Sequence, residues 1–231
     1  IEVSHLVKTF GDFRAVNDIS FSVRRGEIFG FLGANGAGKT TAMRMLCGLS
    51  RPSAGEAMVA GFDVYRQTEQ IKRHIGYMSQ RFSLYDDLTV YENLRLFGGI
   101  YGLSGKAIRE KARLLLEELG LAAERDTLVR SLPLGWKQRL AFSQSIFHDP
   151  QIVFLDEPTG GVDPATRRQF WELIYRAADR GITVFVTTIY ALLINFFRCL
   201  SPRTTGTRRS IATASASWWM ARSKRSTHPP P

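Results

Sequence analysis

The chain has 231 residues, 44% of them hydrophobic and 23% charged, enough for one domain or for a core with one inserted subdomain. Its two cysteines, Cys47 and Cys199, lie far apart with no neighbouring histidine cluster, which argues against a disulfide framework or a zinc site. The net charge is +10. Residues 182–231 contain seven basic and no acidic residues, so the rest of the chain carries a net charge of only +3. A basic tail of this kind is a weak signal for nucleic-acid binding.

The first third of the chain is typical of strands followed by a helix. Ile1-Glu2-Val3 resembles the start of a strand and not a signal peptide. Residues 8–13 and 19–23 are β-rich and separated by turn residues. The apolar run 28–32 then leads through a glycine-rich loop into a predicted helix at 41–49, which together form the first half of a parallel crossover.

Residues from about 88 to 148 change to helical character. Apolar residues of the segment 108–119 recur at helix-face spacing, and Gly120 is a plausible stop. A second helix is predicted from near Trp136 to before Pro150. Strand 152–155, an amphipathic helix through 170–178 and a strand at 182–187 follow. A helical insert in an α/β core is the simplest layout.

The glycine-rich loop matches a phosphate-binding pattern. Residues 33–40 read G-A-N-G-A-G-K-T, which fits G-x-x-x-x-G-K-[ST], and they lie between a strand and a helix as that pattern requires. Its glycines let successive N–H groups point toward phosphate oxygens at a helix N-terminus. We expect Lys39 to contact the β- and γ-phosphates and Thr40 to bind Mg²⁺. The predicted nucleotide contacts are Gly33, Asn35, Gly36, Ala37, Gly38, Lys39, Thr40 and Thr41.

Two carboxylates follow the apolar run 152–155. Asp156 and Glu157 stand where a central strand would end, at the edge where α/β sheets bind ligands. An apolar run followed by Asp-Glu is most often only a strand end. Combined with the phosphate loop, however, it predicts that Asp156 holds Mg²⁺ and that Glu157 activates a water molecule as general base.

Over residues 1–188 these motifs resemble the ATP-binding cassettes of ABC transporters. The resemblance implies a P-loop α/β core with an N-terminal antiparallel β subdomain and an inserted helical subdomain at about 84–149. It also assigns three further sites. Gln80 matches the Q-loop, which in relatives touches Mg²⁺ and contacts the membrane domains. Asp163 matches the D-loop, and Phe10 falls where an aromatic stacks on adenine. A core strand aromatic is an equally good reading of Phe10, and Phe13 is a rival.

The segment 132–139, L-P-L-G-W-K-Q-R, occupies the place of the family signature Leu-Ser-Gly-Gly-Gln. In relatives this loop opens a helix whose N-terminus and serine bind the γ-phosphate held by the opposite subunit. Pro133 removes the hydroxyl and one N–H donor, which leaves Gly135 and the helix end to receive phosphate more weakly. The pattern resembles the divergent cassettes of bacterial drug exporters.

The end of the chain departs from the family. Its switch histidine should follow Val-Thr-Thr, but this chain has Ile189 there, and no histidine occurs before His228. Residues 189–231 are expected to form an aberrant, poorly ordered basic tail. Because that histidine helps to position the base and the water, its loss should impair hydrolysis more than binding.

A frameshift is one explanation of the tail. Trp218-Trp219-Met220-Ala221 must be encoded TGG-TGG-ATG-GCN, and the shifted triplets GTG-GAT-GGC spell Val-Asp-Gly, a turn found at this point in relatives. Extending the shift, codons for residues 203–226 can spell His-Tyr-x-Asp-Glu-Ala and a family-like continuation. A short insertion over about 189–202 would complete the change. A lineage-specific basic extension is the alternative.

The resemblance implies an ATPase that powers export with ATP and Mg²⁺. Its expected partners are transmembrane permease subunits and a second cassette, in a homo- or heterodimer, at the inner face of the cell membrane and in the cytoplasm. No nucleic-acid partner is expected. Two alternatives stay open. One is a soluble ABC-family ATPase of translation or DNA repair, although the chain shows neither two cassettes nor a long coiled insert. The other is a remnant that binds ATP without hydrolysing it.

Overall fold

The computed structural model describes residues 1–80, 83–160, 163–188 and 209–210. Two sheets and six α-helices make up this part of the chain. The prediction of a poorly ordered tail concerns residues outside the described ranges, apart from the backbone of Arg209–Ser210. No helix within the described residues has the length and apolar character needed to cross a membrane.

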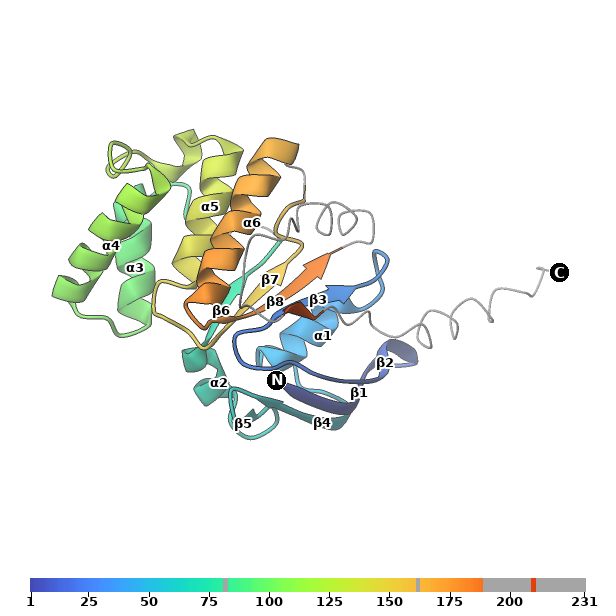
Figure 1. Cartoon of the computed structure of the whole chain (residues 1–231). Coiled ribbons are helices and arrows are strands. Elements are labelled where there is room, and N and C mark those ends of the chain that lie inside the picture. Colours follow the sequence, from blue (N-terminus) through green and yellow to red (C-terminus); the bar gives the residue numbers. More distant parts are fainter. Residues whose placement is uncertain (81–82, 161–162, 189–208, 211–231) are drawn as a thin grey trace.

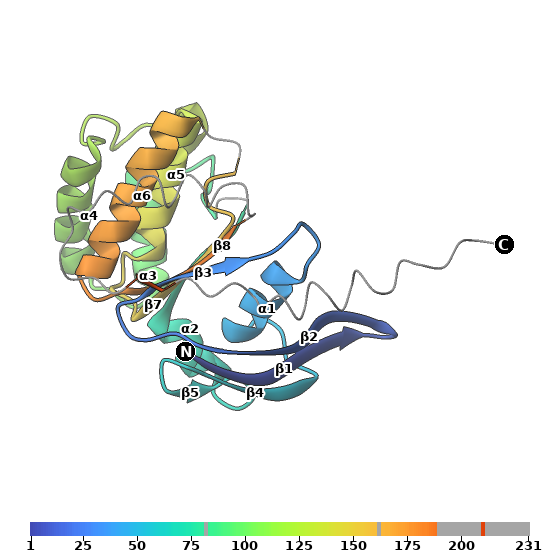
Figure 2. The same ribbon diagram turned by 45° about the vertical axis from the view of Figure 1, so that its right-hand side comes forward.

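The antiparallel sheet has the strand order β2-β1-β4-β5. Its strands are β1 (Glu2–Phe10), β2 (Phe13–Ser22), β4 (Ala54–Val59) and β5 (Phe62–Asp63). Strands β1 and β2 form a long hairpin in which Phe10 pairs with Phe13 at the turn. The hairpin extends beyond the rest of the sheet in Figure 2. β-rich runs were predicted at residues 8–13 and 19–23, but the structure places the hairpin turn inside the first run, between Phe10 and Phe13, and the second run covers the end of β2.

The second sheet is parallel, with the strand order β6-β7-β8-β3-β9. Its strands are β3 (Ile28–Leu32), β6 (Ile75–Met78), β7 (Ile152–Asp156), β8 (Thr183–Thr188) and the two-residue β9 (Arg209–Ser210). All side chains of β3, β7 and β8 are buried, as their continuous apolar sequences require in a sheet covered on both faces.

Helix α1 (Lys39–Leu46) lies between the two sheets (Figure 1). Its buried residues Ala42, Met43, Met45 and Leu46 belong to one core cluster with side chains of both sheets, including Leu6 and Phe185. Helix α2 (Thr68–His74) precedes β6 directly. The core between the sheets therefore holds the helix that begins at the glycine-rich loop.

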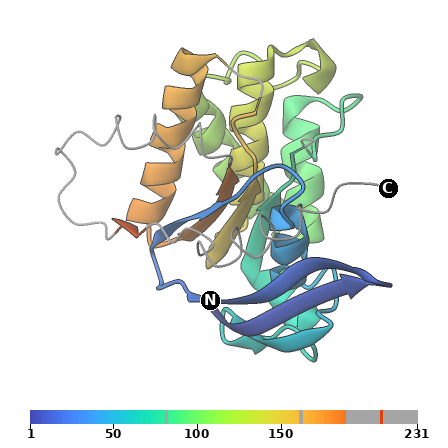
Figure 3. The ribbon, with the colours of Figure 1, turned by 90° about the vertical axis from the view of Figure 1, so that its right-hand side faces the viewer.

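The other face of the parallel sheet is covered by α5 (Leu134–Ser145) and α6 (Pro164–Asp179). Figure 3 shows them above the sheet, with the β1–β2 hairpin below it. Helices α3 (Val90–Ile100) and α4 (Gly105–Leu119) and the short 3₁₀ helix η1 (Val129–Ser131) pack with α5 in a third cluster. The predicted fold class is therefore confirmed: an α/β P-loop core with an antiparallel sheet and helices inserted between β6 and β7.

Candidate active site

The glycine-rich loop joins β3 to α1, and two of its glycines adopt positive φ. Gly36 has φ 73° and Gly38 has φ 84°, values that residues with a Cβ rarely adopt. A Cβ added to Gly38 would also lie 2.2 Å from the carbonyl oxygen of Ala15 on β2. Because the loop presses on the hairpin strand at this point, Gly38 is required both for its backbone conformation and for its packing.

The side chain of Lys39 turns back into the loop. Its ammonium donates to the carbonyl oxygens of Gly33 at 2.9 Å and Ala34 at 3.0 Å, and lies 3.3 Å from Oε1 of Glu157. Lys39 is only 5% exposed, so these partners compensate the cost of burying its charge. The loop and the carboxylate at the end of β7 therefore meet at one cation.

The other predicted nucleotide contacts of the loop differ in exposure. Asn35 is exposed, Ala37 is buried and Thr41 is half-buried. The N–H of Ala37 donates to the carbonyl of Ala34 at 3.1 Å, which closes the loop before α1 begins.

Oxygen ligands gather where the loop meets β7. Thr40 donates from Oγ1 to Oδ1 of Asp156 at 3.1 Å, and Thr187 donates to the same oxygen at 2.7 Å. Hydroxyl and carboxylate oxygens are the ligands that Mg²⁺ prefers, and a protein binds it through few carboxylates together with substrate phosphates. The described residues accordingly contain no cluster of three or more His, Cys, Asp or Glu. This donor set fits Mg²⁺ held jointly with a phosphate.

Glu157 is held in an unusual backbone conformation at the end of β7. Its φ is 49°, and its N–H donates to both the carbonyl oxygen at 3.2 Å and the hydroxyl at 3.0 Å of Thr187. The amide of Gln80, which follows β6, donates to Oε2 of Glu157 at 3.4 Å. Strain of this kind is common at functional sites and orients a side chain.

Thr187 was not predicted as a site residue, although it donates to the carboxylate of Asp156 and accepts from the backbone N–H of Glu157. It is fully buried and stands opposite Asp156 in the parallel pairing of β7 and β8. Its sequence signal is a threonine at the end of the apolar strand 183–188.

Both aromatic candidates lie at the tip of the β1–β2 hairpin. Phe10 and Phe13 are each 54% exposed, and the ammonium of Lys8 lies 4.9 Å from the ring centroid of Phe10. Neither ring is part of the core, so the reading of Phe10 as a core strand aromatic does not hold. The choice between the two rings stays a prediction.

Gly135 and Asp163 lie where α5 meets α6. A Cβ on Gly135 would come 2.8 Å from Cγ2 of Thr166, so α6 packs closely against the first turn of α5. Asp163 caps α6 by accepting from the N–H groups of Ala165 at 2.9 Å and Thr166 at 3.0 Å. Hydrogen bonds from Thr166 lower the pKa of the Asp163 carboxyl. Pro133 is the N-cap of α5 and supplies no side-chain cap.

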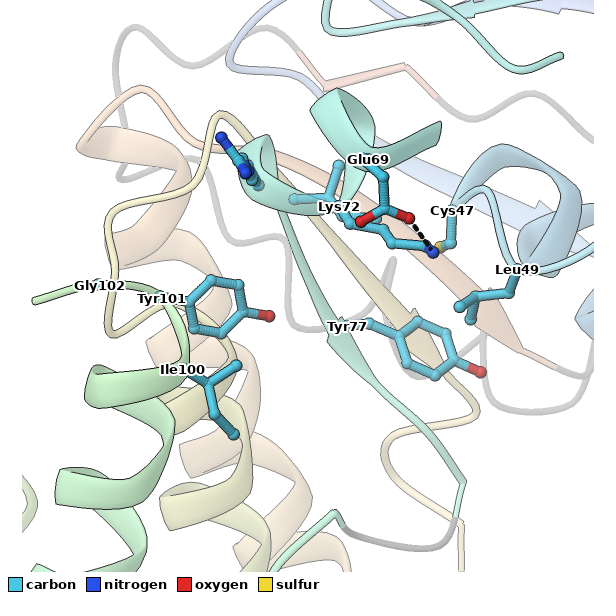
Figure 4. Close-up of a pocket in the computed structure, with 10 residues that line it drawn as sticks. Cys47, Leu49, Glu69, Lys72, Tyr77, Ile100, Tyr101 and Gly102 are labelled. Atoms are coloured by element: carbon cyan, nitrogen blue, oxygen red, sulfur yellow. Dashed lines mark hydrogen bonds and ion pairs between the residues drawn. The ribbon is translucent and has the colours of Figure 1, made fainter. Parts of the chain in front are cut away.

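A groove of about 700 Å³ lies at the other end of α1 from the glycine-rich loop. Figure 4 shows Cys47 and Leu49 after α1, Glu69 and Lys72 on α2, Tyr77 on β6, and Ile100 and Tyr101 at the end of α3. Burial raises the pKa of Tyr77 to about 12 and that of the Cys47 thiol. The groove is thus partly apolar and separate from the glycine-rich loop.

Comparison with known proteins gives matches over most of the chain. A family model described as ABC transporter matches residues 16–160. The chain is 52% identical over 188 residues to the "Probable multidrug ABC transporter ATP-binding protein YbhF" of Escherichia coli (strain K12), which covers 81% of this chain and 32% of that protein. It is 41% identical over 190 residues to the "Daunorubicin/doxorubicin resistance ATP-binding protein DrrA" of Streptomyces peucetius, which covers 82% of this chain and 58% of that protein.

A solved structure described as "Structure of ATP binding subunit of ABC transporter" has a TM-score of 0.74 and 27% identity to the chain. That match covers 85% of this chain and 82% of the other. With respect to the two curated relatives, the chain spans less than two thirds of their length.

Proposed function

The chain belongs to the ABC transporter family, and on this premise we propose that it binds ATP with Mg²⁺ and hydrolyses it to power export through membrane-embedded permease subunits. The observation that carries the proposal is the convergence of Lys39, Thr40, Asp156, Glu157 and Gln80 at one edge of the parallel sheet. The names of the relatives favour a drug-export transporter over a soluble ATPase of translation or DNA repair.

In the proposed site the backbone amides of the loop and the N-terminus of α1 bind the β- and γ-phosphates. Lys39 exchanges its loop carbonyls for phosphate oxygens, and Gly33, Asn35, Gly36, Ala37, Gly38 and Thr41 shape the cradle. Thr40, Asp156 and Gln80 are the proposed Mg²⁺ ligands, direct or through water. When bound, Mg²⁺ supplies Lewis-acid stabilisation of phosphate charge. The aromatic tip of the hairpin, at Phe10, stacks on the base.

Glu157 is the proposed general base. Thr187 holds its backbone, and Gln80 and Lys39 contact its two carboxylate oxygens. A water molecule beside Glu157 would transfer a proton to the carboxylate as it attacks the γ-phosphate. Ile189 stands where relatives have a histidine that helps to position this water. We therefore propose that the chain hydrolyses ATP more slowly than a cassette that has this histidine.

The test replaces the base. Glu157→Gln keeps the size of the side chain but removes its proton affinity, so nucleotide affinity should stay within about twofold while single-turnover hydrolysis falls roughly 100-fold or more. The exposed Glu172→Gln serves as the matched control and should leave both unchanged. Equal rates in Glu157→Gln and the parent, with both binding ATP, would mean that another group activates the water or, where both rates are zero, that the chain only binds the nucleotide.

We also propose that a second cassette completes the site. In that arrangement the first turn of α5 at Gly135, and Asp163 at the start of α6, face the nucleotide of the partner. The contact between Gly135 and Thr166 supports a joint movement of these two segments. The missing serine at Pro133 predicts a weaker contact with the γ-phosphate than in relatives that have it.

The groove beside α2 is the proposed docking surface for a permease segment on the cytoplasmic face of the membrane. Ile100 is 65% exposed and Leu49 is 49% exposed, so apolar area faces solvent between the core and the inserted helices. Lys72 and Arg73 in the last turn of α2 line the groove and add basic charge, with Lys72 paired to Glu69 at 2.6 Å. An apolar segment with an acidic residue would complement both features.

Ile100→Glu would place a charge in that groove, far from the glycine-rich loop. Co-purification with the membrane subunit encoded in the same gene neighbourhood should fall at least tenfold, while ATP affinity stays unchanged. Leu114 is an exposed apolar residue outside the groove, so Leu114→Glu is the control and should co-purify like the parent. Normal co-purification of Ile100→Glu would place the permease contact elsewhere.

A further inference from the structure

Helix α5 carries two glutamines in the interior of the protein. Gln138 is 0% exposed and Gln144 is 4% exposed. Amide side chains are seldom buried so completely unless they are hydrogen-bonded. Because the two are six residues apart on a helix with 3.6 residues per turn, they point in different directions.

Each glutamine donates to a backbone carbonyl that lies close in sequence to a proposed catalytic residue. Gln138 donates from Nε2 to the carbonyl oxygen of Pro158, the residue after Glu157. Gln144 donates from Nε2 to the carbonyl oxygen of Ser83 at 3.2 Å, three residues after Gln80. One helix therefore contacts both segments.

The two segments also meet each other, since Gln80 donates to Glu157 at 3.4 Å. At its end, α5 presses on the strand that leads to Gln80: a Cβ on Gly76 of β6 would come 1.9 Å from the carbonyl oxygen of Ser145. Helix α5 thus contacts Pro158, which follows Glu157, the strand β6, which leads to Gln80, and Ser83.

Packing alone does not explain these side chains. Oε1 of Gln138 and Oε1 of Gln144 are both buried and have no hydrogen-bond partner within the part of the chain that the structure describes. An unpaired buried amide oxygen is destabilising, and a methionine would fill similar space without one. Unlike methionine, each glutamine amide donates a hydrogen bond to a backbone carbonyl, that of Pro158 or that of Ser83.

We propose that Gln138 and Gln144 are positioning residues. They keep Glu157 and Gln80 in a fixed position relative to α5 and to its first turn at Gly135. The inference rests on the proposed ATPase function. A change in the nucleotide beside Glu157 would then alter the position of the start of α5 through the Gln138 contact. Trp136 lies two residues before Gln138 and would sense this change. Gln144 holds Ser83 near the other end of the helix, where Ser145 packs on the strand that leads to Gln80.

The experiment uses the full chain with Gln138→Met, Gln144→Met and, as control, Gln169→Met at an exposed glutamine of α6. Affinity for a fluorescent ATP analogue is measured first and should stay within about twofold in all three. Single-turnover hydrolysis should fall at least tenfold in the first two and not in the control. In a Gln80→Ala background the effect of Gln144→Met should largely disappear, because Gln144 acts through Gln80.

A second readout does not depend on turnover. The four tryptophans of the chain are labelled with 5-fluorotryptophan, and the ¹⁹F resonance of Trp136 is assigned with Trp136→Phe. Saturating MgATP should shift this resonance in the parent, and Gln138→Met should reduce the shift by more than half at equal occupancy. A parent that binds MgATP without a shift, or a Gln138→Met response equal to the parent's, overturns the inference. A parent that binds no nucleotide overturns the proposed function itself.

Discussion

One threonine, Thr187, contacts the carboxylate of Asp156 and the backbone of Glu157. The Thr187 hydroxyl donates to Asp156 and accepts from the N–H of Glu157, while Thr40 donates to the same oxygen of Asp156. The two hydroxyls leave the other carboxylate oxygen of Asp156 for further contacts. A proposed metal ligand and the backbone of the proposed base are therefore oriented by a residue of the neighbouring strand.

Lys39 supplies the only side-chain ammonium described beside the loop carbonyls, so Lys39→Ala tests the phosphate site. Hydrogen bonds to charged groups contribute about 2 kcal/mol, so ATP affinity should fall roughly 30-fold while the melting temperature changes little. Calorimetric titration measures the affinity. Lys106→Ala, at an exposed lysine of α4, should bind like the parent. Unchanged affinity in Lys39→Ala would remove the phosphate-loop assignment.

His148 predicts an acid-sensitive stability. Its ring stacks on Tyr101 with centroids 3.5 Å apart, and Nε2 lies 3.0 Å from the carbonyl oxygen of Ile75. Burial lowers the pKa of His148 to about 4, with Asp149 opposing the shift and Lys111 adding to it. Because the unfolded chain binds this proton at a higher pH, near 6.5, the stability is present above pH 6.5 and lost as the pH falls toward 4.

The melting temperature should therefore drop by on the order of a few °C between pH 6.5 and 4.5. His148→Gln keeps a donor for Ile75 but does not titrate, and should show a smaller drop across the same interval. Equal pH profiles for the two proteins would contradict the buried neutral histidine.

At the scale of elements, the contact between α5 and β6 depends on a glycine. Gly76→Ala would place a methyl group 1.9 Å from the carbonyl oxygen of Ser145, which is a backbone atom and not the end of a flexible side chain. Such overpacking should lower the free energy of unfolding by about 3 kcal/mol. Gly99→Ala in α3 is the matched control, since no atom lies within 4 Å of its added Cβ.

Within a helix, glycine is less favourable than alanine, so Gly99→Ala should raise stability by about 0.5–1 kcal/mol. Urea denaturation should therefore show changes in the free energy of unfolding of opposite sign for Gly76→Ala and Gly99→Ala if the α5–β6 contact is as close as described. A Gly76→Ala midpoint equal to the parent's would show that the helix can move away from the strand.

At the scale of the whole molecule, the parallel sheet positions the site between its two flanking layers. The strand order places β8 between β7 and β3, so Thr187 reaches Asp156 from one side while the glycine-rich loop reaches it from the end of β3. Residues 189–208 and 211–231 lie outside the described structure. The backbone of Arg209–Ser210 pairs with Ile28–Phe29 at the far edge of β3.

The frameshift hypothesis for the tail makes a prediction at this scale. The gene should carry codons for residues 203–226 that spell His-Tyr and, later, Val-Asp-Gly in the shifted frame. A chain with that frame restored and residues 189–202 removed should hydrolyse ATP roughly tenfold faster or more, because the restored histidine stabilises developing charge. Single-turnover rates compare the two chains at equal ATP occupancy. Codons that cannot yield the shifted reading would leave the basic extension as the explanation.

The sequence by itself determined the local parts of the site. The strand, glycine-rich loop and helix of residues 28–49, and the apolar run that precedes Asp156-Glu157, are read from neighbouring residues because strand and helix periodicity is a local property. The family resemblance added Gln80, Gly135 and Asp163, and the fold class followed from the alternation of strands and helices.

Only the tertiary structure decided which distant groups touch. Thr187 joins Asp156 across 31 residues, and Gln138 reaches Pro158 from a helix whose apolar pattern gives no hint of it. Such contacts depend on strand register and on how closely a helix packs on a sheet, and neither is encoded in the periodicity of a single segment. The exposure of Phe10 and Phe13 was likewise decided by the hairpin, which extends both aromatics beyond the core.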